Sequence, residues 1–341
     1  MTTLIRPPAS LPAPRDVQSS PRPEARAHQQ RPPRGRSTII VASDGSSGSD
    51  GAIRMAFSQF KPMDALLEVV TVVAGGHGEG AVEMMLAQDD DSARRRHQRD
   101  AVEAQLARIS GEPGGHSVTV LDGSAARTIA SVAIERHADF VIVGLGRHDL
   151  TDRLFGSETA VQLARISRVP VLAVRENAIA GATHAIVAVD FSEIAERAAQ
   201  AAIDMVGDGG IVELVHVTPY VAEYPLSLQG QEPYKSWARG QLDALIGRLT
   251  AAPGVSLRRA VVRGRAAHVL LERASRVGAD LIAAGTHGRG YVARAVLGSV
   301  TSDLLRGAHC AVLLVPREPL TASTAAEHAP AAAPAPPATP G

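Results

Sequence analysis

The chain repeats one pattern twice, and this internal repeat constrains the fold more than any other feature of the sequence. Each half alternates short apolar runs with segments of helical character, and the second half follows the first at an offset of about 141 to 146 residues. Apolar runs without polar alternation are typical of strands that are buried on both faces of a parallel sheet. The repeat therefore predicts a tandem duplication of one α/β unit.

Five strands are predicted in each half. In the first half they are expected at 37–43, 66–73, 117–121, 140–143 and 171–174. Their counterparts in the second half are expected at 185–189, 211–218, 256–262, 281–284 and 312–315. Helices are predicted between them, including 51–59, 91–109, 193–205 and 235–249. Right-handed crossovers then give two five-stranded parallel sheets with helices on both faces, and ligands belong at the carboxyl ends of the strands.

Composition divides the chain into two folded units and two tails. Residues 1–36 are rich in Pro and Arg and contain nothing that could form a core, so we expect a disordered basic arm. A solvated tail is the simpler interpretation of this arm, and contact with an acidic partner or nucleic acid is the alternative. The folded units are expected at 37–176 and 184–316, and residues 317–341 form a second, Ala/Pro-rich disordered tail.

Charge and hydropathy argue against several classes of protein. With 35 basic and 35 acidic residues, the formal net charge is zero, so no whole-molecule field attracts nucleic acid or anionic lipid. No apolar run reaches membrane-spanning length, and the first residues lack the apolar segment of a signal peptide. The single cysteine, Cys310, is expected to be a small buried hydrophobe. We expect a cytoplasmic protein without a nucleic-acid or membrane partner.

A glycine-rich loop in the second half carries the clearest chemical signal. The strand predicted at 281–284 ends at Gly285, and the loop continues through Gly288 to Gly298 and Ser299, which open a helix. Glycines let the backbone approach phosphate oxygens closely, and the N–H groups at a helix start attract negative charge. The strand, the loop and the helix together predict a site for an anion such as a phosphate.

The spacing of this loop, G-x2-G-x9-G-S, resembles the ATP-binding signature G-x2-G-x9-G-(S/T) of the universal stress protein family. The resemblance extends over residues 37–316 and implies two tandem Rossmann-like units of the adenine nucleotide α-hydrolase type. It also implies that ATP lies across the strand ends, mainly in the second half. The residues that the resemblance assigns to ATP are Asp190, Val217, Gly285, Gly288, Gly298, Ser299 and Val300.

Simpler structural roles compete with ligand contacts at some positions. Asp190 and Ser192 precede an Ala-rich helix, where such residues commonly cap the first turn, and capping is compatible with ligand contact. His216 falls on a predicted buried strand and is interpreted as a packed core residue. His287 lies in the glycine loop, where it could contact ribose or solvent.

The first half carries a degenerate version of the same loop. Alignment from Asp139 leaves one residue fewer between Gly144 and Gly146, and Gly156 and Ser157 follow after nine residues. We therefore expect the first half to bind nucleotide weakly or to be structural.

Charge also separates the two loops. Glu158 takes the place of Val300, and a carboxylate at a helix start is itself favoured by about 0.3–1 kcal/mol. Such a carboxylate would occupy the anion position and repel a nucleotide. Asp44 and Val72 still match the adenine-side positions, so the first site is not wholly erased.

Catalytic and metal chemistry have little support in the sequence. No lysine follows the glycine loop as in a P-loop, and no nucleophile, base and orienting group occur together. His77, His97 and His116 lack metal-ligand spacing. Bound ATP would bring Mg²⁺ through its phosphates rather than through a dedicated protein cage.

The sequence therefore predicts an ATP-binding universal stress protein, a nucleotide-dependent sensor that acts on unidentified protein partners. The resemblance implies that the two halves pack through their last strands as an intramolecular pseudo-dimer, with a homodimer as a further option. The alternatives are a nucleotide-free dimeric scaffold, which the degenerate first loop favours, a weak ATP hydrolase, and an enzyme of the wider adenine nucleotide α-hydrolase-like group.

Overall fold

The computed structural model describes residues 37–74, 81–111, 116–146, 157–178, 181–218, 228–287 and 297–317. The tails predicted at 1–36 and 317–341 lie outside these residues, apart from Arg317.

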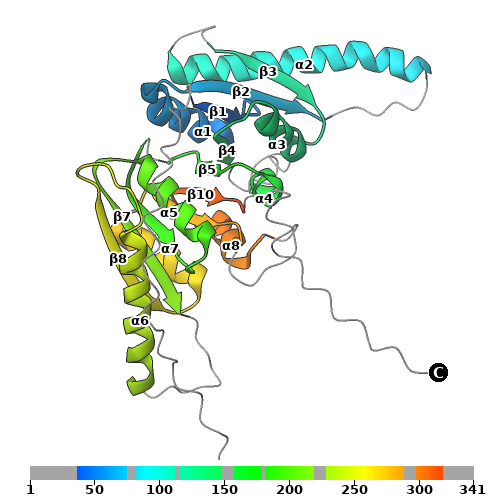
Figure 1. Ribbon diagram of the computed structural model, residues 1–341. Coiled ribbons are helices and arrows are strands. Elements are labelled where there is room, and N and C mark those ends of the chain that lie inside the picture. The colour runs from blue at the N-terminus through cyan, green and yellow to red at the C-terminus, as the bar shows by residue number, and fades with distance from the viewer. Residues whose placement is uncertain are drawn as a thin grey trace, which may run out of the picture. The chain divides into compact units, whose positions relative to one another are not determined.

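The first half contains its five expected strands within the described ranges. They are β1 (Thr38–Ala42), β2 (Leu66–Val73), β3 (Val118–Asp122), β4 (Phe140–Leu145) and β5 (Val171–Arg175). The helices are α1 (Asp50–Met55), α2 (Ala81–Ser110), α3 (Ala125–Glu135) and α4 (Ser157–Ile166) (Figure 1). A 3-10 turn (Ser47–Ser49) precedes α1, and a π-helical turn (Ala56–Phe60) and a second 3-10 turn (Lys61–Met63) continue it.

The second half repeats this succession. Its strands are β6 (Ala182–Ala188), β7 (Val206–Thr218), β8 (Ser256–Arg263), β9 (Leu281–Gly285) and β10 (Ala311–Val315). Its helices are α5 (Glu193–Met205), α6 (Leu228–Ile246), α7 (Ala266–Val277) and α8 (Ser299–Gly307) (Figure 1).

The ten strands form one sheet in the order β3-β2-β1-β4-β5-β10-β9-β6-β7-β8. All pairings inside a half are parallel. At the junction of the halves β5 pairs antiparallel with β10, with Leu172 opposite Leu313. The expected α/β class and the packing of the halves through their last strands are thereby confirmed. In each half the strand order reverses beside the first strand, which is where open α/β sheets place their ligands.

Alternate residues of each strand face opposite sides of the sheet, and this produces two apolar layers. Ile39 and Val41 of β1 pack in one layer with residues of α1, α2, α5 and α6, whereas Ile40 and Ala42 pack in the other with residues of α3, α4, α7 and α8. Because both faces of the central strands are covered, β1, β4, β5, β9 and β10 are apolar at nearly every position, whereas the edge strand β8 carries Arg258 and Arg259.

The glutamate near the start of each second strand has a partner on a helix. Glu213 of β7 is buried and accepts a hydrogen bond from Arg273 of α7, with 2.6 Å between Nε and Oε2. This hydrogen bond raises the pKa of the Arg273 guanidinium above its ordinary value. In the first half Glu68 of β2 lies 3.5 Å from the half-exposed Arg136. The second half therefore holds the more buried version of one ion pair.

Some boundaries differ from the sequence-based prediction. Helix α2 begins at Ala81 rather than near residue 91, because the intervening residues contain no helix breaker. Helix α6 begins at Leu228 and includes Pro233, a residue that generally disfavours a helix interior. Strand β7 begins at Val206 rather than at Ile211. None of these differences changes the strand order.

Cys310 is buried, as expected. Burial, together with the negative charge of Asp280, raises the pKa of the Cys310 thiol to about 12. The thiol therefore stays protonated in the folded chain near neutral pH.

Candidate functional site

A cavity of about 300 Å³ lies at the carboxyl ends of β6, β7 and β9. The predicted site residues that line it are Asp190, Val217, Gly285, Gly298, Ser299 and Val300. Gly288, the remaining predicted residue of this half, lies outside the described residues. These residues lie close together because the strands are parallel, so their carboxyl ends meet at one edge of the sheet.

Asp190 and Ser192 form the turn between β6 and α5. One carboxylate oxygen of Asp190 accepts hydrogen bonds from the Ser192 backbone N–H at 3.0 Å and from its hydroxyl at 2.5 Å. Ser192 is the N-cap of α5, and its side chain accepts from the Ala195 N–H at 3.2 Å. The capping role is therefore present, and it holds both side chains in the lining of the cavity.

Gly285 and Gly298 have different structural roles in the loop. A Cβ at Gly285 would lie 2.6 Å from the Cγ2 of Ile194, so this glycine lets α5 pack closely on β9. The N–H of Gly298 donates to the Thr286 carbonyl at 3.1 Å, which ties the end of the loop to the strand it left. Gly298 then caps α8, whose first residues, Ser299 and Val300, border the cavity.

His216 is a satisfied core histidine that also borders the cavity. Its Nδ1 lies 2.8 Å from the Val189 carbonyl oxygen and its Nε2 lies 3.0 Å from the Tyr234 hydroxyl. Because a carbonyl only accepts, Nδ1 carries the proton, and in the neutral ring Nε2 accepts from Tyr234. Phe191 and Trp237 complete an aromatic cluster around this ring.

His287 differs from His216 because one of its nitrogens is unsatisfied. Its Nδ1 lies 3.0 Å from the Thr286 hydroxyl oxygen, whereas its Nε2 is buried and has no hydrogen-bond partner among the described residues. His287 borders the cavity. A buried polar atom without a partner is uncommon in folded proteins, so His287 differs in this respect from the satisfied His216.

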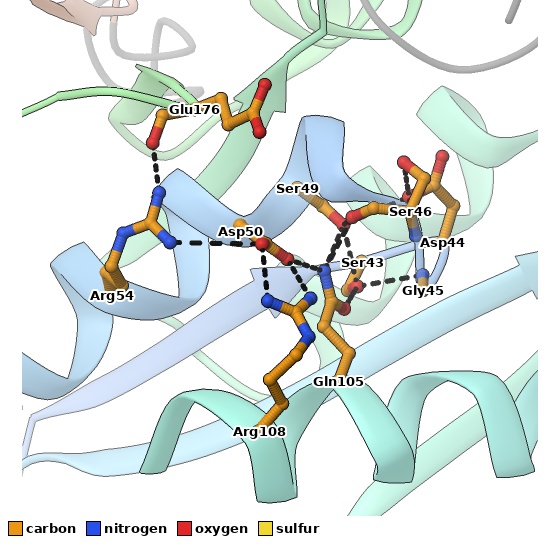
Figure 2. Close-up of polar contacts among 10 residues, drawn as sticks. All are labelled: Ser43, Asp44, Gly45, Ser46, Ser49, Asp50, Arg54, Gln105, Arg108 and Glu176. Carbon is orange, nitrogen blue, oxygen red and sulfur yellow. Dashed lines mark hydrogen bonds and ion pairs between the residues drawn. The ribbon is translucent and has the colours of Figure 1, made fainter.

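At the corresponding strand ends of the first half, polar side chains are hydrogen-bonded to one another (Figure 2). Gln105 of α2 accepts a hydrogen bond from the Ser43 hydroxyl at 2.5 Å. Its amide nitrogen donates to Ser49 Oγ at 3.0 Å, and to Asp50 Oδ1 and the Ser46 carbonyl at 2.6 Å each. We call these five residues the Gln105 network.

Two positions of the Gln105 network explain why the halves differ. Aligned from the aspartate after the first strand, Ser43 stands where the second half has Val189, and Ser49 stands where it has Ala195. Val189 and Ala195 border the cavity of the second half. Where apolar side chains leave space in one half, hydroxyls hydrogen-bonded to Gln105 lie in the other.

An ion pair between the buried Asp50 and the exposed Arg108 adjoins the Gln105 network. Asp50 accepts from both terminal nitrogens of Arg108 at 2.8 Å. Burial alone would raise the pKa of Asp50, but the hydrogen bonds from Arg108 and Gln105 outweigh it and hold this pKa below its ordinary value. Sequence reasoning missed Gln105, Asp50 and Arg108. The available signal was the polar Ser43 at the end of an otherwise apolar strand.

Only some of the residues predicted for a first-half site are arranged like their counterparts in the second half. Asp44 accepts from the Ser46 N–H at 3.0 Å, as Asp190 does from Ser192, and Val72 is buried on β2. Gly144 lies in β4, and Gly146 follows Leu145, the last residue of that strand. A Cβ at Gly144 would overlap the Gly48 carbonyl oxygen.

The start of α4 completes the comparison. Gly156 lies outside the described residues, and Ser157 opens α4. Glu158 lies exposed in the first turn of α4 and accepts from Gln162 at 3.1 Å. Its predicted repulsion of a nucleotide stays a prediction.

The described residues contain no group of three or more His, Cys, Asp or Glu side chains that could hold a metal ion. Among their helices, none is long and apolar enough to cross a bilayer.

The fold and the cavity define the class of protein first: a tandem α/β protein with a candidate ligand site at the carboxyl ends of parallel strands. The family follows from the sequence. The profile of the universal stress protein family matches residues 35–175 and 182–316, well over half of the chain, and the chain belongs to this family.

Individual relatives support this assignment. A universal stress protein of Mycolicibacterium smegmatis is 28% identical over 289 residues, which cover 81% of this chain and 96% of that protein. A universal stress protein of Mycobacterium tuberculosis is 32% identical over 195 residues, which cover 54% of this chain and 63% of that protein. The crystal structure of a universal stress protein from Archaeoglobus fulgidus has the same fold, with a TM-score of 0.57 and 19% identity over 82% of this chain and 98% of that one.

Proposed function

We propose that this chain is an ATP-binding universal stress protein, a cytoplasmic regulator whose nucleotide occupancy changes its conformation or its choice of protein partner. ATP binds mainly in the C-terminal half. The division into folded units at 37–176 and 184–316 belongs to the same proposal. The observation that carries it is the cavity at the ends of β6, β7 and β9, which is lined by six of the seven residues that the family resemblance assigns to ATP.

The chemistry of the lining fits such a ligand. Ala188, Val189 and Val215 supply apolar surface for a base, and the Asp190 carboxylate suits an exocyclic amine or a ribose hydroxyl. The start of α8 provides backbone N–H groups for phosphate oxygens.

Mg²⁺ would enter with the phosphates of ATP, since phosphate oxygens are its usual protein-site ligands. Among the described residues that border the cavity, Asp190 is the one acidic residue, and its carboxylate is already bonded to Ser192. We therefore propose binding and regulation rather than an evolved hydrolase, with slow ATP hydrolysis as a secondary activity.

A second candidate function is supported by one observation. The side chains of the Gln105 network are hydrogen-bonded to one another without a ligand, which favours a scaffold role for the first half. In this version the first half contributes protein contacts and the second half contributes the nucleotide.

The test is calorimetric titration of the full chain with ATP, with GTP as a comparison ligand. We expect one site per chain and expect Val300→Glu to weaken it roughly 100-fold or more. This variant places beside the phosphates the carboxylate that the first half carries at Glu158, and like charges a few ångströms apart repel strongly. Val300→Gln has the same size without the charge and should retain most of the affinity. Absence of ATP binding in the parent chain would overturn the proposal, and two equal sites would overturn its restriction to one half.

A further inference from the structure

Four ring side chains of the second half pack together: Phe191, His216, Tyr234 and Trp237. The Phe191 ring, in the turn between β6 and α5, has its centroid 4.4 Å from that of His216 and 5.4 Å from that of Trp237. Tyr234 and Trp237 lie on α6, with their ring centroids 5.4 Å apart. We call these four residues the aromatic cluster.

The backbone of Phe191 has a conformation that is costly for a bulky residue. Its φ is 63°, in the left-handed region, where the Cβ of any residue other than glycine is crowded. At the equivalent position of the first half, between Asp44 and Ser46, the chain has Gly45 with a φ of 78°. The two turns therefore share one backbone form, which is strained in the second half and unstrained in the first.

The helix residue that faces each turn differs between the halves in the same sense. Counted back from the Gln–Leu pair of each helix, Ala101 of α2 corresponds to Trp237 of α6. A Cβ on Gly45 would lie 3.0 Å from the Ala101 Cβ, so the first half has no room for a ring at this position. In the second half the Phe191 and Trp237 rings meet edge to face, at 75°. Because a strained conformation persists only where its surroundings hold it, this ring contact supports the turn.

The strained turn is also a wall of the cavity. Val189, Asp190 and Ser192 line the cavity, whereas Phe191 packs against the apolar layer that contains residues of α5 and α6. His216 adds a second link, because its Nδ1–H donates to the Val189 carbonyl oxygen at 2.8 Å. The conformation of the turn therefore decides where the polar groups of Asp190 and Ser192 lie in the cavity lining.

We propose that Phe191 and Trp237 are positioning residues of the site: their contact holds the turn at Asp190 in its left-handed form, so that the affinity for ligand and the packing of α6 change together. This inference rests on the proposed nucleotide site and adds to it two residues that are not among those lining the cavity. Linkage makes the effect reciprocal, because a ligand that favours this form of the turn also favours the ring contact on α6.

The experiment is a double-mutant cycle on the full chain, with ATP affinity measured by calorimetry. Trp237→Ala should weaken ATP binding about 3- to 10-fold, in the lower part of the range for residues in contact. Phe191→Gly adopts the left-handed form without strain, as Gly45 does, so the turn no longer depends on the ring of Trp237. Adding Trp237→Ala to Phe191→Gly should therefore change the affinity less than about twofold.

Two further measurements separate positioning from a general loss of stability. Trp237→Phe keeps a ring against Phe191 and should retain most of the ATP affinity. Trp237 is the one tryptophan of the chain and is 45% exposed, so acrylamide quenching of its fluorescence reports on this part of α6. ATP should reduce the quenching in the parent chain, and should reduce it less in Phe191→Gly, where the turn and the ring of Trp237 are uncoupled.

The outcomes distinguish the positioning role from the proposed function. ATP affinity that is unchanged in Trp237→Ala, or is weakened equally by this change in the parent and in Phe191→Gly, would overturn the positioning role and leave the nucleotide site intact. Quenching of Trp237 that ATP leaves unchanged would do the same. A parent chain that binds no ATP would overturn the proposed function itself.

Discussion

The two halves of this chain have the same strand order but different contents at the same place. At the carboxyl ends of β6 and β9 the second half has a cavity bordered by Val189 and Ala195. At the ends of β1 and β4 the first half has Ser43 and Ser49, whose hydroxyls are bonded to Gln105 of α2. The comparison teaches that a duplicated fold can keep its backbone plan while a few side chains change what lies at the strand ends, here from an apolar lining to internal hydrogen bonds.

The same asymmetry extends to the helices that cover the sites. Thr71 of β2 accepts from Gln98 of α2 at 2.9 Å, whereas at the corresponding place in the second half His216 of β7 meets Tyr234 of α6. The first half is therefore closed by amides and hydroxyls that satisfy each other. The second half is bordered by aromatic rings and retains an unsatisfied nitrogen at His287.

The largest effect is expected for the ion pair between Arg273 and Glu213, which is more buried than the pair between Arg136 and Glu68 in the first half. Arg273→Ala should lower the free energy of unfolding by about 3 kcal/mol, because Glu213 would be left buried and uncompensated. Arg136→Ala, its matched control in the first half, should cost about 1 kcal/mol or less, since Arg136 is half exposed and 3.5 Å from Glu68. Urea denaturation of both variants measures the difference, and equal losses would contradict the comparison.

The Gln105 network should contribute the next largest effect. Gln105→Ala leaves Ser43, Ser49 and Asp50 without a partner they now have, so we expect a loss of about 2 kcal/mol in unfolding free energy. Gln241 of α6 precedes the buried Leu242 as Gln105 precedes the buried Leu106, but it is exposed. Gln241→Ala should therefore cost less than about 0.5 kcal/mol. A negligible loss in Gln105→Ala would show that the network does not hold the first half closed.

A smaller effect is expected from the charge at the start of α4. In a chain whose second site is blocked by Val300→Glu, the change Glu158→Val isolates the first half. A carboxylate at a helix start is worth about 0.3–1 kcal/mol, so we expect ATP affinity there to rise less than tenfold. The measurement is ATP titration beside a Glu158→Gln control. A gain well above tenfold would mean that charge alone closes the first site, and would count against the Gln105 network as the main obstacle.

The smallest effect at neutral pH concerns Cys310. Its folded pKa of about 12 lies above the ordinary value of 9.0, so the folded chain holds a proton that the unfolded chain releases first. Stability should therefore fall as the pH rises from about 9 toward 12. Val169 is the first-half counterpart of Cys310, so Cys310→Val is a suitable control. This variant should show less of the decline in stability. Denaturation midpoints at pH 8 and pH 10.5 test it, and the native thiol should resist a thiol reagent at pH 8.

Much of the fold could be predicted because its signals are local. The apolar run ending at Asp44 and the run ending at Asp190 were recognised as strands from their own residues, and both are strands of the sheet. The loop from Gly285 to Ser299 was found from spacing alone, and its described residues border the cavity. Helix ends were less predictable, since α6 continues through Pro233 against the usual tendency of that residue.

The contents of the two sites could not be predicted from the same signals. Gln105 is separated from Ser43 by 62 positions, and no local sequence pattern near either residue indicates their contact. His287 was placed in the glycine loop by sequence, but its unsatisfied Nε2 depends on every side chain around it. Long-range contacts of this kind follow from how a helix lies over the strand ends.

The sequence by itself determined the tandem α/β plan, the family and the position of the glycine loop, because apolar periodicity and glycine spacing act through the local backbone. The tertiary structure alone decided that Gln105 is hydrogen-bonded to Ser43 and Ser49 at the strand ends of the first half, and that the second half has a cavity bordered by the glycine loop. The physical reason is that space and hydrogen-bond satisfaction are properties of packed neighbours, and those neighbours come from distant parts of the chain.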